Sequence, residues 1–504
     1  MKDESFTRKF VPAVQSLQAM EKVVFNMSQV SVYPVHKLAV LQNDYIVKVR
    51  ALGESDWSIV PTYQVKVDMH DVRNASMAYF DFTGTVEVKV MSCHYVYQVD
   101  IRPINEQIKP EFTTQEISFV LNKPVNLSIE INKDRFHNLH LFAGKMIANV
   151  PDMNSENVLV LEGSLERYSG YYKEGIEARL ANMPEGRILY IKPGIHYLEE
   201  GCLRIPSNTV VYMEGGAIIV GNFICDNVHD VHIFGRGILY LANFERYGGK
   251  CGFQLDYSSN ITIEDCMLIN PPHYTVALGE CKNITIRNIK SFSCEGWSDG
   301  IDMMSCENIL VEGGFLRTSD DCIAIYGHRW NYYGNTSKVR IKDIILWADV
   351  AHPICIGTHG ESEKEGNILE NICFENIDIL EHHEYQAGYL GCMAINVGDK
   401  NLARNIKFEN IRIEPFEHGK LFDFQVKWNP DYNPCPGKGI QNIILKNIYY
   451  DGDGDETSVI EGFSSEFMVN DVHIENLVRN GIRITSFEEG NIQVGQYTKN
   501  ITIK

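Results

Sequence analysis

Three aspartates lie in two short segments whose spacing could bring their carboxylates together. One segment, residues 295–302, reads EGWSDGID, and the other, residues 317–322, reads RTSDDC. When carboxylates lie close together, their pKa values separate, so that one keeps a proton as a general acid while another stays ionised as a base. Such a pair can hydrolyse a glycosidic bond. Taken singly, an Asp-Gly or Asp-Asp pair is also an ordinary turn signal, so the register of Asp299 with Asp320 and Asp321 decides between the two interpretations.

A degenerate repeat in the second part of the chain supplies that register. An Asn-apolar-x-apolar motif recurs at intervals of 22 to 37 residues, starting at Asn208, Asn260, Asn283, Asn308, Asn371, Asn405 and Asn442, with variants at Asp230, Lys338 and Asp471. Short β-branched strands separated by Gly and Asn turns are typical of a solenoid. The repeat predicts a right-handed parallel β-helix of about ten coils, with Ile, Val, Leu and Cys inside and each Asn in a left-handed bend, where its side chains can form ladders.

The repeat length places the aspartates in neighbouring coils. Asp299 and Asp320 are 21 residues apart, just under the 25 residues that separate Asn283 from Asn308. Neighbouring strands lie about 4.7–4.9 Å apart. We therefore expect Asp320 or Asp321 to lie one coil from Asp299, on the same side of the β-helix.

The first part of the chain follows a different pattern. Roughly residues 20–150 alternate apolar and polar residues in short runs such as 85–90, 95–101, 117–121 and 127–131. Period-2 runs separated by turns indicate antiparallel strands, and about seven of them indicate a β-sandwich. Residues 8–20 could form a short helix. Residues 151–158 lack periodicity, so we divide the all-β chain into a sandwich, 1–152, and a β-helix, 153–504.

Composition excludes several classes of protein. The 504 residues carry a formal charge of −20, which disfavours nucleic acid and anionic membranes. No apolar stretch is long enough for a membrane helix. Thirteen scattered cysteines indicate reduced thiols, among them Cys266, Cys281, Cys306, Cys322 and Cys373. These features, with no secretory signal at the start, favour the cytoplasm, or secretion if a leader was removed. The oligomeric state is open.

The motifs resemble glycoside hydrolase family 28, the polygalacturonases. Ser-Asp-Gly-Ile-Asp, then Ser-Asp-Asp-Cys-Ile one coil later, then a His-containing segment, follow that family's order. A sandwich before a β-helix is similar to family 49, the dextranases and isopullulanases. The resemblance implies inverting hydrolysis of a pectin-type galacturonide or rhamnogalacturonan, with Asp320 as general acid and with Asp299 and Asp321 activating water.

Further residues are expected to bind the sugar. His352 falls where family 28 has a histidine that could tune the acid or bond to substrate. Family 28 also carries an Arg-x-Lys one coil later, which holds the uronate carboxylate, and residues 376–400 lack it. Arg329 and Trp330 could compensate, because arginine pairs with carboxylates and aromatic rings suit sugar faces. We expect substrate contacts from His352, Arg329, Trp330, Trp297, His359 and His383.

Other functions stay open at this stage. The histidine–glutamate pairs near His359 and His383 could suggest zinc, but we expect no metal and no cofactor, and the sequence has no phosphate-binding loop. The alternatives are a family-49-like α-glucan hydrolase, a non-catalytic carbohydrate-binding β-helix, and a β-elimination lyase. A lyase needs an Arg or Lys base, which we do not find beside Asp299 and Asp320.

Overall fold

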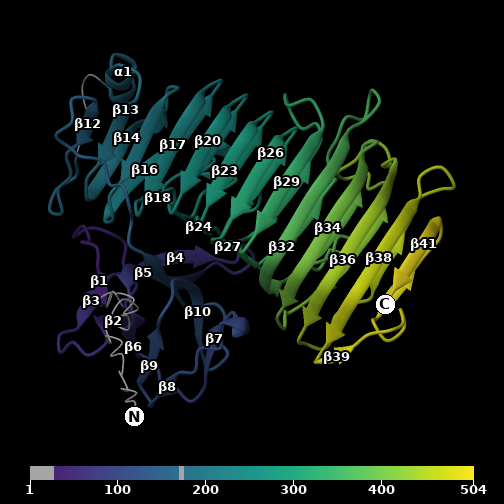
Figure 1. Ribbon diagram of the computed structural model, residues 1–504, viewed down its shortest axis with the longest axis horizontal. Helices are drawn as coiled ribbons and strands as arrows, with labels where there is room; N and C mark the ends of the chain where they lie inside the picture. Colours follow the sequence, from purple (N-terminus) through teal and green to yellow (C-terminus); the bar gives the residue numbers. More distant parts are fainter. Residues whose placement is uncertain (1–27, 170–174, 387) are drawn as a thin grey trace, which may run out of the picture.

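The computed structural model describes residues 28–169, 175–386 and 388–504. The helix expected at 8–20 lies outside them. The described chain forms two parts, a sandwich and a long β-helix that lies along it (Figure 1). None of the helices in these ranges is long and apolar enough to cross a membrane.

Two sheets make the sandwich, as predicted. The first sheet consists of β1 (Gln29–Ser31), β5 (Arg73–Thr83), β11 (Leu139–Lys145), β10 (Val125–Ile131) and β7 (Val99–Arg102), with β4 (Thr62–Val67) paired to β5. The second consists of β3 (Ser58–Val60), β2 (Tyr45–Ala51), β6 (Val86–Ser92), β9 (Glu116–Leu121) and β8 (Glu111–Phe112). A 3-10 helix, η1 (Ile104–Glu106), follows β7.

Alternating residues of both sheets form the sandwich core. Val47 and Val49 of β2 pack with Leu127 and Ile129 of β10, all fully buried. The alternation of apolar and polar residues in these strands thus arises because one face of each sheet packs in the core and the other faces solvent. The run at 95–101 is an exception, because its strand starts only at Val99 and the tyrosines before it are exposed.

The second part is the predicted β-helix, with three parallel faces per coil. The first face carries the repeat motif and consists of β12 (Val158–Leu161), β13 (Arg187–Ile191), β15 (Thr209–Met213), β17 (His229–Gly235), β20 (Ser259–Glu264), β23 (Lys282–Arg287), β26 (Glu307–Glu312), β29 (Thr336–Lys342), β32 (Ile368–His382), β34 (Leu402–Ile413), β36 (Gly439–Tyr450), β38 (Val469–Arg479) and β41 (Thr498–Ile503). These are thirteen strands, so the stack is longer than the expected ten coils, because β12, β13 and β41 extend it beyond the ten motif positions counted in the sequence.

The other two faces follow the first in the coils that begin with β13 to β38. The second face consists of β14 (Gly194–Arg204), β16 (Ala217–Asp226), β18 (Ile238–Tyr240), β21 (Met267–Ile269), β24 (Lys290–Phe292), β27 (Phe315–Thr318) and β30 (Ile345–Ala348), continued by the end of β32. The third consists of β19 (Phe253–Asp256), β22 (Val276–Gly279), β25 (Ile301–Met304), β28 (Ile323–Tyr326), β31 (Ile354–Ile356), β33 (Met393–Val397), β35 (Phe422–Val426), β37 (Ser458–Glu461) and β40 (Ile492–Val494). A short β39 (Ile482–Arg483) pairs back onto β38.

The repeated asparagine does what the pattern predicts. Asn260, Asn283 and Asn308 have φ of 55°, 58° and 59°, in the left-handed region that Asn tolerates. The Nδ2 of Asn283 donates to Oδ1 of Asn260 at 2.9 Å, and Asn308 donates to Asn283 at 2.7 Å. This ladder fixes the bend of each coil above the previous one, which keeps the strands of all three faces in register.

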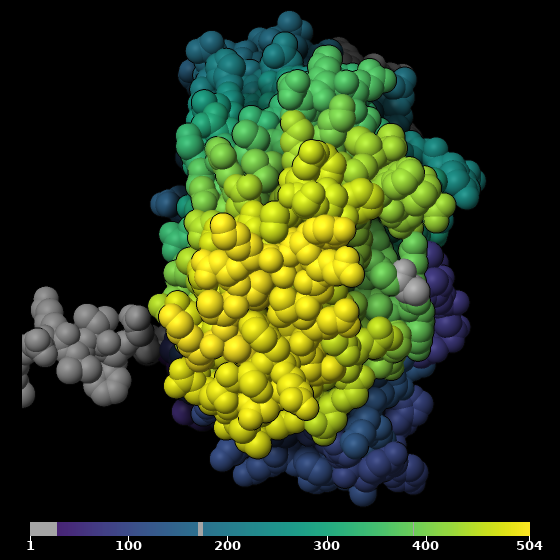
Figure 2. Space-filling view, turned by 90° about the vertical axis from the view of Figure 1, so that its right-hand side faces the viewer, coloured from purple at the N-terminus to yellow at the C-terminus, as the bar shows by residue number. Residues whose placement is uncertain are grey.

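Ile and Val side chains from the coils form one continuous buried core from Leu159 to Ile492. A short helix, α1 (Ile176–Ala181), covers its first end with the buried Leu180 (Figure 1). At the other end, the last coils form the surface that faces the viewer in Figure 2. Cys266, Cys281, Cys306 and Cys322 are free and buried, whereas Cys373 is free and only partly buried.

The sandwich packs on the second face of the β-helix. Tyr63, Met77 and Phe142 share an apolar cluster with Phe292 and Phe315 of the β-helix. The last sandwich strand ends at Lys145 and β12 begins at Val158. We keep the division between residues 152 and 153 as a proposal. Because the sandwich covers the second face, the first and third faces and their turns are the ones left open to solvent.

Candidate active site

Two of the predicted carboxylates and a histidine occupy equivalent positions in three successive coils. Asp299, Asp321 and His352 each lie two residues before a paired residue of the third face, namely Ile301, Ile323 and Ile354. Backbone hydrogen bonds join the coils at this point, from Gly300 N to the Asp321 carbonyl and from Cys322 N to the His352 carbonyl, both 2.8 Å. The expected register holds, and Asp321 is the residue in line with Asp299.

All three predicted carboxylates converge. Oxygens of Asp299, Asp320 and Asp321 lie within 4.8 Å of one another. Asp299 and Asp321 are 5% and 3% exposed, so these two carboxylates are largely buried. Three acidic groups at this distance cannot all ionise freely, which is the condition for dividing acid and base roles among them.

Two backbone amides hold the carboxylate of Asp320. Its Oδ2 accepts from the Trp297 amide at 2.9 Å, and its Oδ1 accepts from the Asp321 amide at 3.0 Å. Burial, followed by the charge of Asp321, raises the pKa of Asp320 to about 6, although these amides and His352 lower it. A carboxyl group with this pKa retains a proton in mildly acidic solution and can donate it.

Asp321 is bound to His352. Its Oδ1 accepts from the His352 amide at 3.0 Å and lies 2.7 Å from Nδ1 of the ring. His352 is fully buried, and its Nε2 has no hydrogen-bond partner among the described residues. Tyr389 packs edge-on against this ring at 4.6 Å. The contact with Nδ1 fixes the ring and leaves Nε2 as the free polar atom.

Asp302, which follows Asp299 in the same motif, is a fourth buried carboxylate that the sequence analysis did not select. It points outward from β25, between Ala277 and Ala324 in the adjacent coils, and neither of its oxygens has a hydrogen-bond partner among the described residues. Burial, then repulsion from the other carboxylates, raises the pKa of Asp299; burial also raises that of Asp302. The small alanines on either side leave room above the strand.

Arg329 faces this group. The guanidinium lies 5.1 Å from the ring of Tyr326 and 6.0 Å from the ring of Tyr274. Burial disfavours its charge, but the tyrosines, Asp302 and Asp299 outweigh burial, so the pKa of Arg329 is raised. The sequence indicated Arg329 as a substrate contact but no lyase base beside Asp299, and the loop after β28 brings the charge of Arg329 close enough to act on Asp299.

Serine side chains hold the turns that carry the aspartates. The Ser293 hydroxyl donates to the Ser298 carbonyl at 2.7 Å and accepts from the Ser319 amide at 3.1 Å. The Ser319 hydroxyl donates to the Ser293 carbonyl at 3.0 Å. Ser293 and Ser319 are fully buried, so these bonds clamp the Asp299 turn to the Asp320 turn.

Two exposed tryptophans, Trp297 and Trp330, lie in the segments that carry Asp299 and Arg329. These two are 48% and 51% exposed, and both have left-handed backbones, with φ of 65° and 55°. Trp330 stacks on Tyr274 at 5.7 Å, and His273 lies 6.3 Å from Trp297 and 6.2 Å from Trp330. Exposed indoles held in strained backbone are typical of binding surfaces.

The other two predicted histidines have different surroundings. His359 packs against Tyr326 at 5.0 Å, and burial, then Arg329, lowers its pKa to about 3, so it is a neutral member of the site. His383 instead contacts Glu417 at 3.7 Å and Tyr385. The structure gives no contact between His383 and the carboxylates. Its neighbour His382, a fully buried residue, stacks on His352 at 6.2 Å.

Groups that could bind a metal differ from those considered in the sequence. Asp321, His352 and Cys355 converge within 4.8 Å, as do the three aspartates. In the first group the Asp321 oxygen already accepts from the His352 amide and contacts its ring. These contacts fit an acid–base arrangement without a cation.

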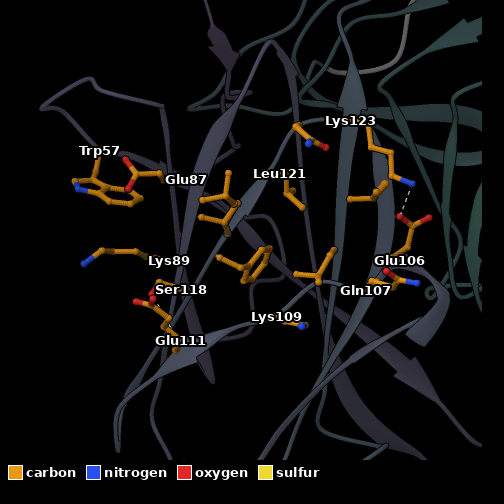
Figure 3. Close-up of a pocket in the computed structure, with 16 residues that line it drawn as sticks. Trp57, Glu87, Lys89, Glu106, Gln107, Lys109, Glu111, Ser118, Leu121 and Lys123 are labelled. Atoms are coloured by element: carbon orange, nitrogen blue, oxygen red, sulfur yellow. Dashed lines mark hydrogen bonds and ion pairs between the residues drawn. The ribbon is translucent and has the colours of Figure 1, made fainter.

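A second hollow lies far from these residues, in the sandwich. A cavity of about 580 Å³ is lined by Trp57, Lys89, Glu106, Lys109 and Lys123, among others, which Figure 3 draws as sticks. Lys123 pairs with Glu106 at 2.7 Å, and Lys89 pairs with Glu116 at 2.8 Å. Because none of the predicted site residues lines it, the group of carboxylates beside the third face is the better candidate.

Comparisons with known proteins agree with this location. Residues 250–481 match the family model for glycosyl hydrolases family 28. A polygalacturonase from Juniperus ashei is 26% identical over 208 residues, which are 40% of this chain and 38% of that relative. The chain therefore spans well under half the length of that curated relative.

Solved structures are similar over most of the chain. Dex49A from Penicillium minioluteum has a TM-score of 0.57 at 14% identity, covering 94% of this chain and 96% of that one. The Yersinia enterocolitica family 28 exopolygalacturonase has a TM-score of 0.51 at 11% identity, covering 88% and 98%. At identities this low, the structural likeness shows a shared fold alone. The resemblance to glycoside hydrolase family 28 is thereby confirmed for residues 250–481, the part of the chain that carries Asp299, Asp320 and Asp321.

Proposed function

We propose that this protein hydrolyses a galacturonide bond in a pectin-type oligosaccharide or polysaccharide, with inversion at the anomeric carbon. The observation that carries the proposal is the convergence of Asp299, Asp320 and Asp321 within 4.8 Å, in a segment that matches family 28. Its relatives include a polygalacturonase and a probable exopolygalacturonase, and this likeness supports the substrate class.

Asp320 is the general acid in this proposal. It has the pKa of about 6 that suits proton donation, and two backbone amides hold its orientation. It gives its proton to the glycosidic oxygen as the bond breaks. Burial and the charge of Asp321 keep that proton available.

Asp299 and Asp321 together bind and deprotonate the attacking water. They lie in register on adjacent coils, so one water molecule can donate a hydrogen bond to each of the two carboxylates. His352 positions Asp321 through its amide and Nδ1. A water shared by two carboxylates attacks directly, without a covalent intermediate, which gives inversion.

Arg329 supplies the positive charge that a uronate needs where the Arg-x-Lys pair is absent. Its charge interacts with those of Asp302 and Asp299, and it forms no ion pair within 4.0 Å among the described residues. A bidentate contact with the sugar carboxylate would satisfy it. The raised pKa of Arg329 argues against its acting as the base of a lyase.

A panel of substrates tests the proposal. The purified protein is incubated with oligogalacturonides, rhamnogalacturonan fragments and α-glucans, and new reducing ends and absorbance from a C=C bond are recorded. We expect reducing ends from galacturonides without new absorbance. Release from α-glucans alone would favour the family-49-like alternative, new absorbance would favour a lyase, and binding without turnover would favour a carbohydrate-binding β-helix.

A further inference from the structure

Behind His352 lies a second fully buried histidine, His382, which takes no part in the proton transfers of the proposed reaction. It is the last residue of β32, in the coil after His352, and its ring stacks on that of His352 at 6.2 Å. Phe416 packs edge-on against the ring at 5.7 Å. A Cβ at Gly419 would overlap the ring, so only glycine leaves room for it. These contacts allow the ring one orientation.

Hydrogen bonds at both ring nitrogens fix the tautomer of His382. Its Nε2 lies 2.9 Å from the amide nitrogen of Gly391, which can only donate. Nε2 therefore accepts, and the hydrogen is on Nδ1, which donates to the Ala351 carbonyl at 2.9 Å. Burial, then the neighbouring histidines, lowers the pKa of His382 well below its ordinary value. The ring is thus neutral and uses both of its nitrogens.

The Ala351 carbonyl and the His352 amide belong to the same planar peptide unit. The His352 amide donates to Oδ1 of Asp321 at 3.0 Å. One peptide is therefore held by His382 at its oxygen and by Asp321 at its hydrogen. A bond donated to a peptide carbonyl polarises the unit and strengthens the bond that its N–H donates. The chain of hydrogen bonds thus runs from the Gly391 amide through His382 to the carboxylate of Asp321.

The backbone at this peptide is strained. Ala351 has φ of 62°, in the left-handed region that a residue with a Cβ rarely adopts. A residue persists in such a conformation only when the surrounding structure holds it there. The bond from Nδ1 of His382 is one contact that does so. Without it, we expect the peptide to rotate toward a relaxed conformation and the His352 amide to turn away from Asp321.

We propose that His382 is a positioning residue for the water-activating carboxylate Asp321. Its Nδ1–H holds the Ala351–His352 peptide, and that peptide holds Asp321 in place beside Asp299. The inference rests on the proposed function, because Asp321 acts as a base only in that reaction. A purely structural histidine would affect stability alone, whichever of its two hydrogen bonds is removed.

Two substitutions separate the two bonds of His382. An asparagine amide reaches the position of Nδ1, so His382→Asn keeps a donor for the Ala351 carbonyl. A glutamine amide reaches the position of Nε2, so His382→Gln keeps only the contact with Gly391. The control is His418→Asn, one coil further on, whose ring contacts Glu456 at 3.2 Å and stacks on Tyr385 at 4.4 Å.

Steady-state kinetics on trigalacturonide is measured from pH 4 to 9 for these proteins. We expect His382→Gln to lower kcat about tenfold or more with KM within about twofold, since a displaced base loses part of its contribution. His382→Asn should stay within about threefold of wild type, and His418→Asn should match it. A hydrogen bond donated to a carboxylate favours its ionised form. The acid side of the kcat/KM profile should therefore move to higher pH in His382→Gln alone. Equal losses in the two His382 variants, or wild-type kinetics in His382→Gln, would overturn the inference.

Deuterium exchange separates this inference from the proposed function, because it needs no turnover. The exchange of the His352 amide is followed by mass spectrometry in wild type and both His382 variants. We expect exchange at least about tenfold faster in His382→Gln than in the other two. Equal exchange rates would overturn the inference while hydrolysis stands. Faster exchange in His382→Gln, in a protein that hydrolyses no galacturonide, would support the positioning of Asp321 and remove the proposed function.

The tautomer of His382 can be measured even if the glutamine variant does not fold. Ring ¹⁵N spectra of histidine-labelled wild type are recorded from pH 5 to 8, and the signals absent from His382→Asn are assigned to His382. We expect a neutral ring with its hydrogen on Nδ1 throughout. A ring with its hydrogen on Nε2, or one that becomes charged in this range, would contradict the proposed chain of hydrogen bonds.

Discussion

At the scale of single residues, two adjacent aspartates have opposite environments. Asp320 is held by backbone amides and has a raised pKa, whereas Asp321 is paired with a fixed histidine. Successive residues of a regular strand point to opposite faces. Asp320 and Asp321 lie in the turn before β28, not in a regular strand, so both side chains join the same group of carboxylates in different orientations. The division of acid and base follows from local backbone geometry.

The pKa of Asp320 predicts the pH dependence of activity. A general acid must be protonated, and Asp320 loses its proton as the pH rises through about 6. We expect kcat/KM on trigalacturonide to fall tenfold per pH unit above about 6, measured by initial rates from pH 4 to 9. A rate that stays level to pH 8 would remove Asp320 from the role of acid.

The same carboxyl group should lower stability at neutral pH. Its pKa is raised from about 3.9 in the unfolded chain to about 6 in the fold, so the folded state binds the proton more tightly. Stability is therefore lost as the pH rises from 4 to 6. We expect Asp320→Asn to melt at a higher temperature than wild type at pH 7.5, with a smaller difference at pH 4.5. A variant that melts lower at pH 7.5 would contradict this electrostatic cost.

At the scale of elements, the repeat explains what could be predicted. The left-handed asparagines and the buried Ile columns follow from local residue preferences, so coils and register were accessible from the sequence. Asp299 and Asp321 came together because they belong to that register. Arg246 and His273 were missed because they lie on turns of earlier coils, and only the three-dimensional path of a loop brings them beside Trp297.

A side chain of the sandwich helps to hold β27, the strand that leads to Asp320. Arg317, at the end of β27, is fully buried and makes two 2.9 Å bonds to Asp349, while its Nη1 donates to Asn138 of the sandwich at 3.0 Å. Asn138 in turn donates to Ser128 at 2.8 Å. No periodicity in the sequence indicates contacts of this kind, since the partners lie in separate parts of the chain.

Removing one partner of this buried pair should be costly. We expect Asp349→Ala to destabilise the protein by about 3–5 kcal/mol, because Arg317 is left charged and buried. Asp71→Ala, which breaks the exposed pair with Arg73, is the control and should cost less than about 1 kcal/mol. Denaturant unfolding of both variants checks this, and equal losses would show that Arg317 finds another partner.

At the scale of the whole molecule, the net charge repels an acidic substrate, whereas the local charge beside the carboxylates attracts it. The net charge of −20 repels a polyanion at long range. The sandwich covers the second face, so the approach to the carboxylates is from the third face, where Arg246 and Arg329 provide local positive charge. Long substrates experience the whole field, and short ones mainly the site.

Salt separates the two effects. Raising NaCl from about 20 to 200 mM shortens the Debye length to below about 10 Å and screens the long-range repulsion. We expect kcat/KM on polygalacturonate to rise several-fold, while that on trigalacturonide changes less than twofold. A steep fall on the polymer would instead show that attraction by the site dominates its approach.

The stereochemistry of the first product tests the central claim most directly. Wild-type protein is mixed with a trigalacturonide of α configuration, and the anomeric proton of the newly formed reducing end is followed by NMR before mutarotation. Direct attack by a water held between Asp299 and Asp321 predicts that the β anomer forms first. An α anomer formed first, or a trapped glycosyl ester on any of the three aspartates, would contradict the account.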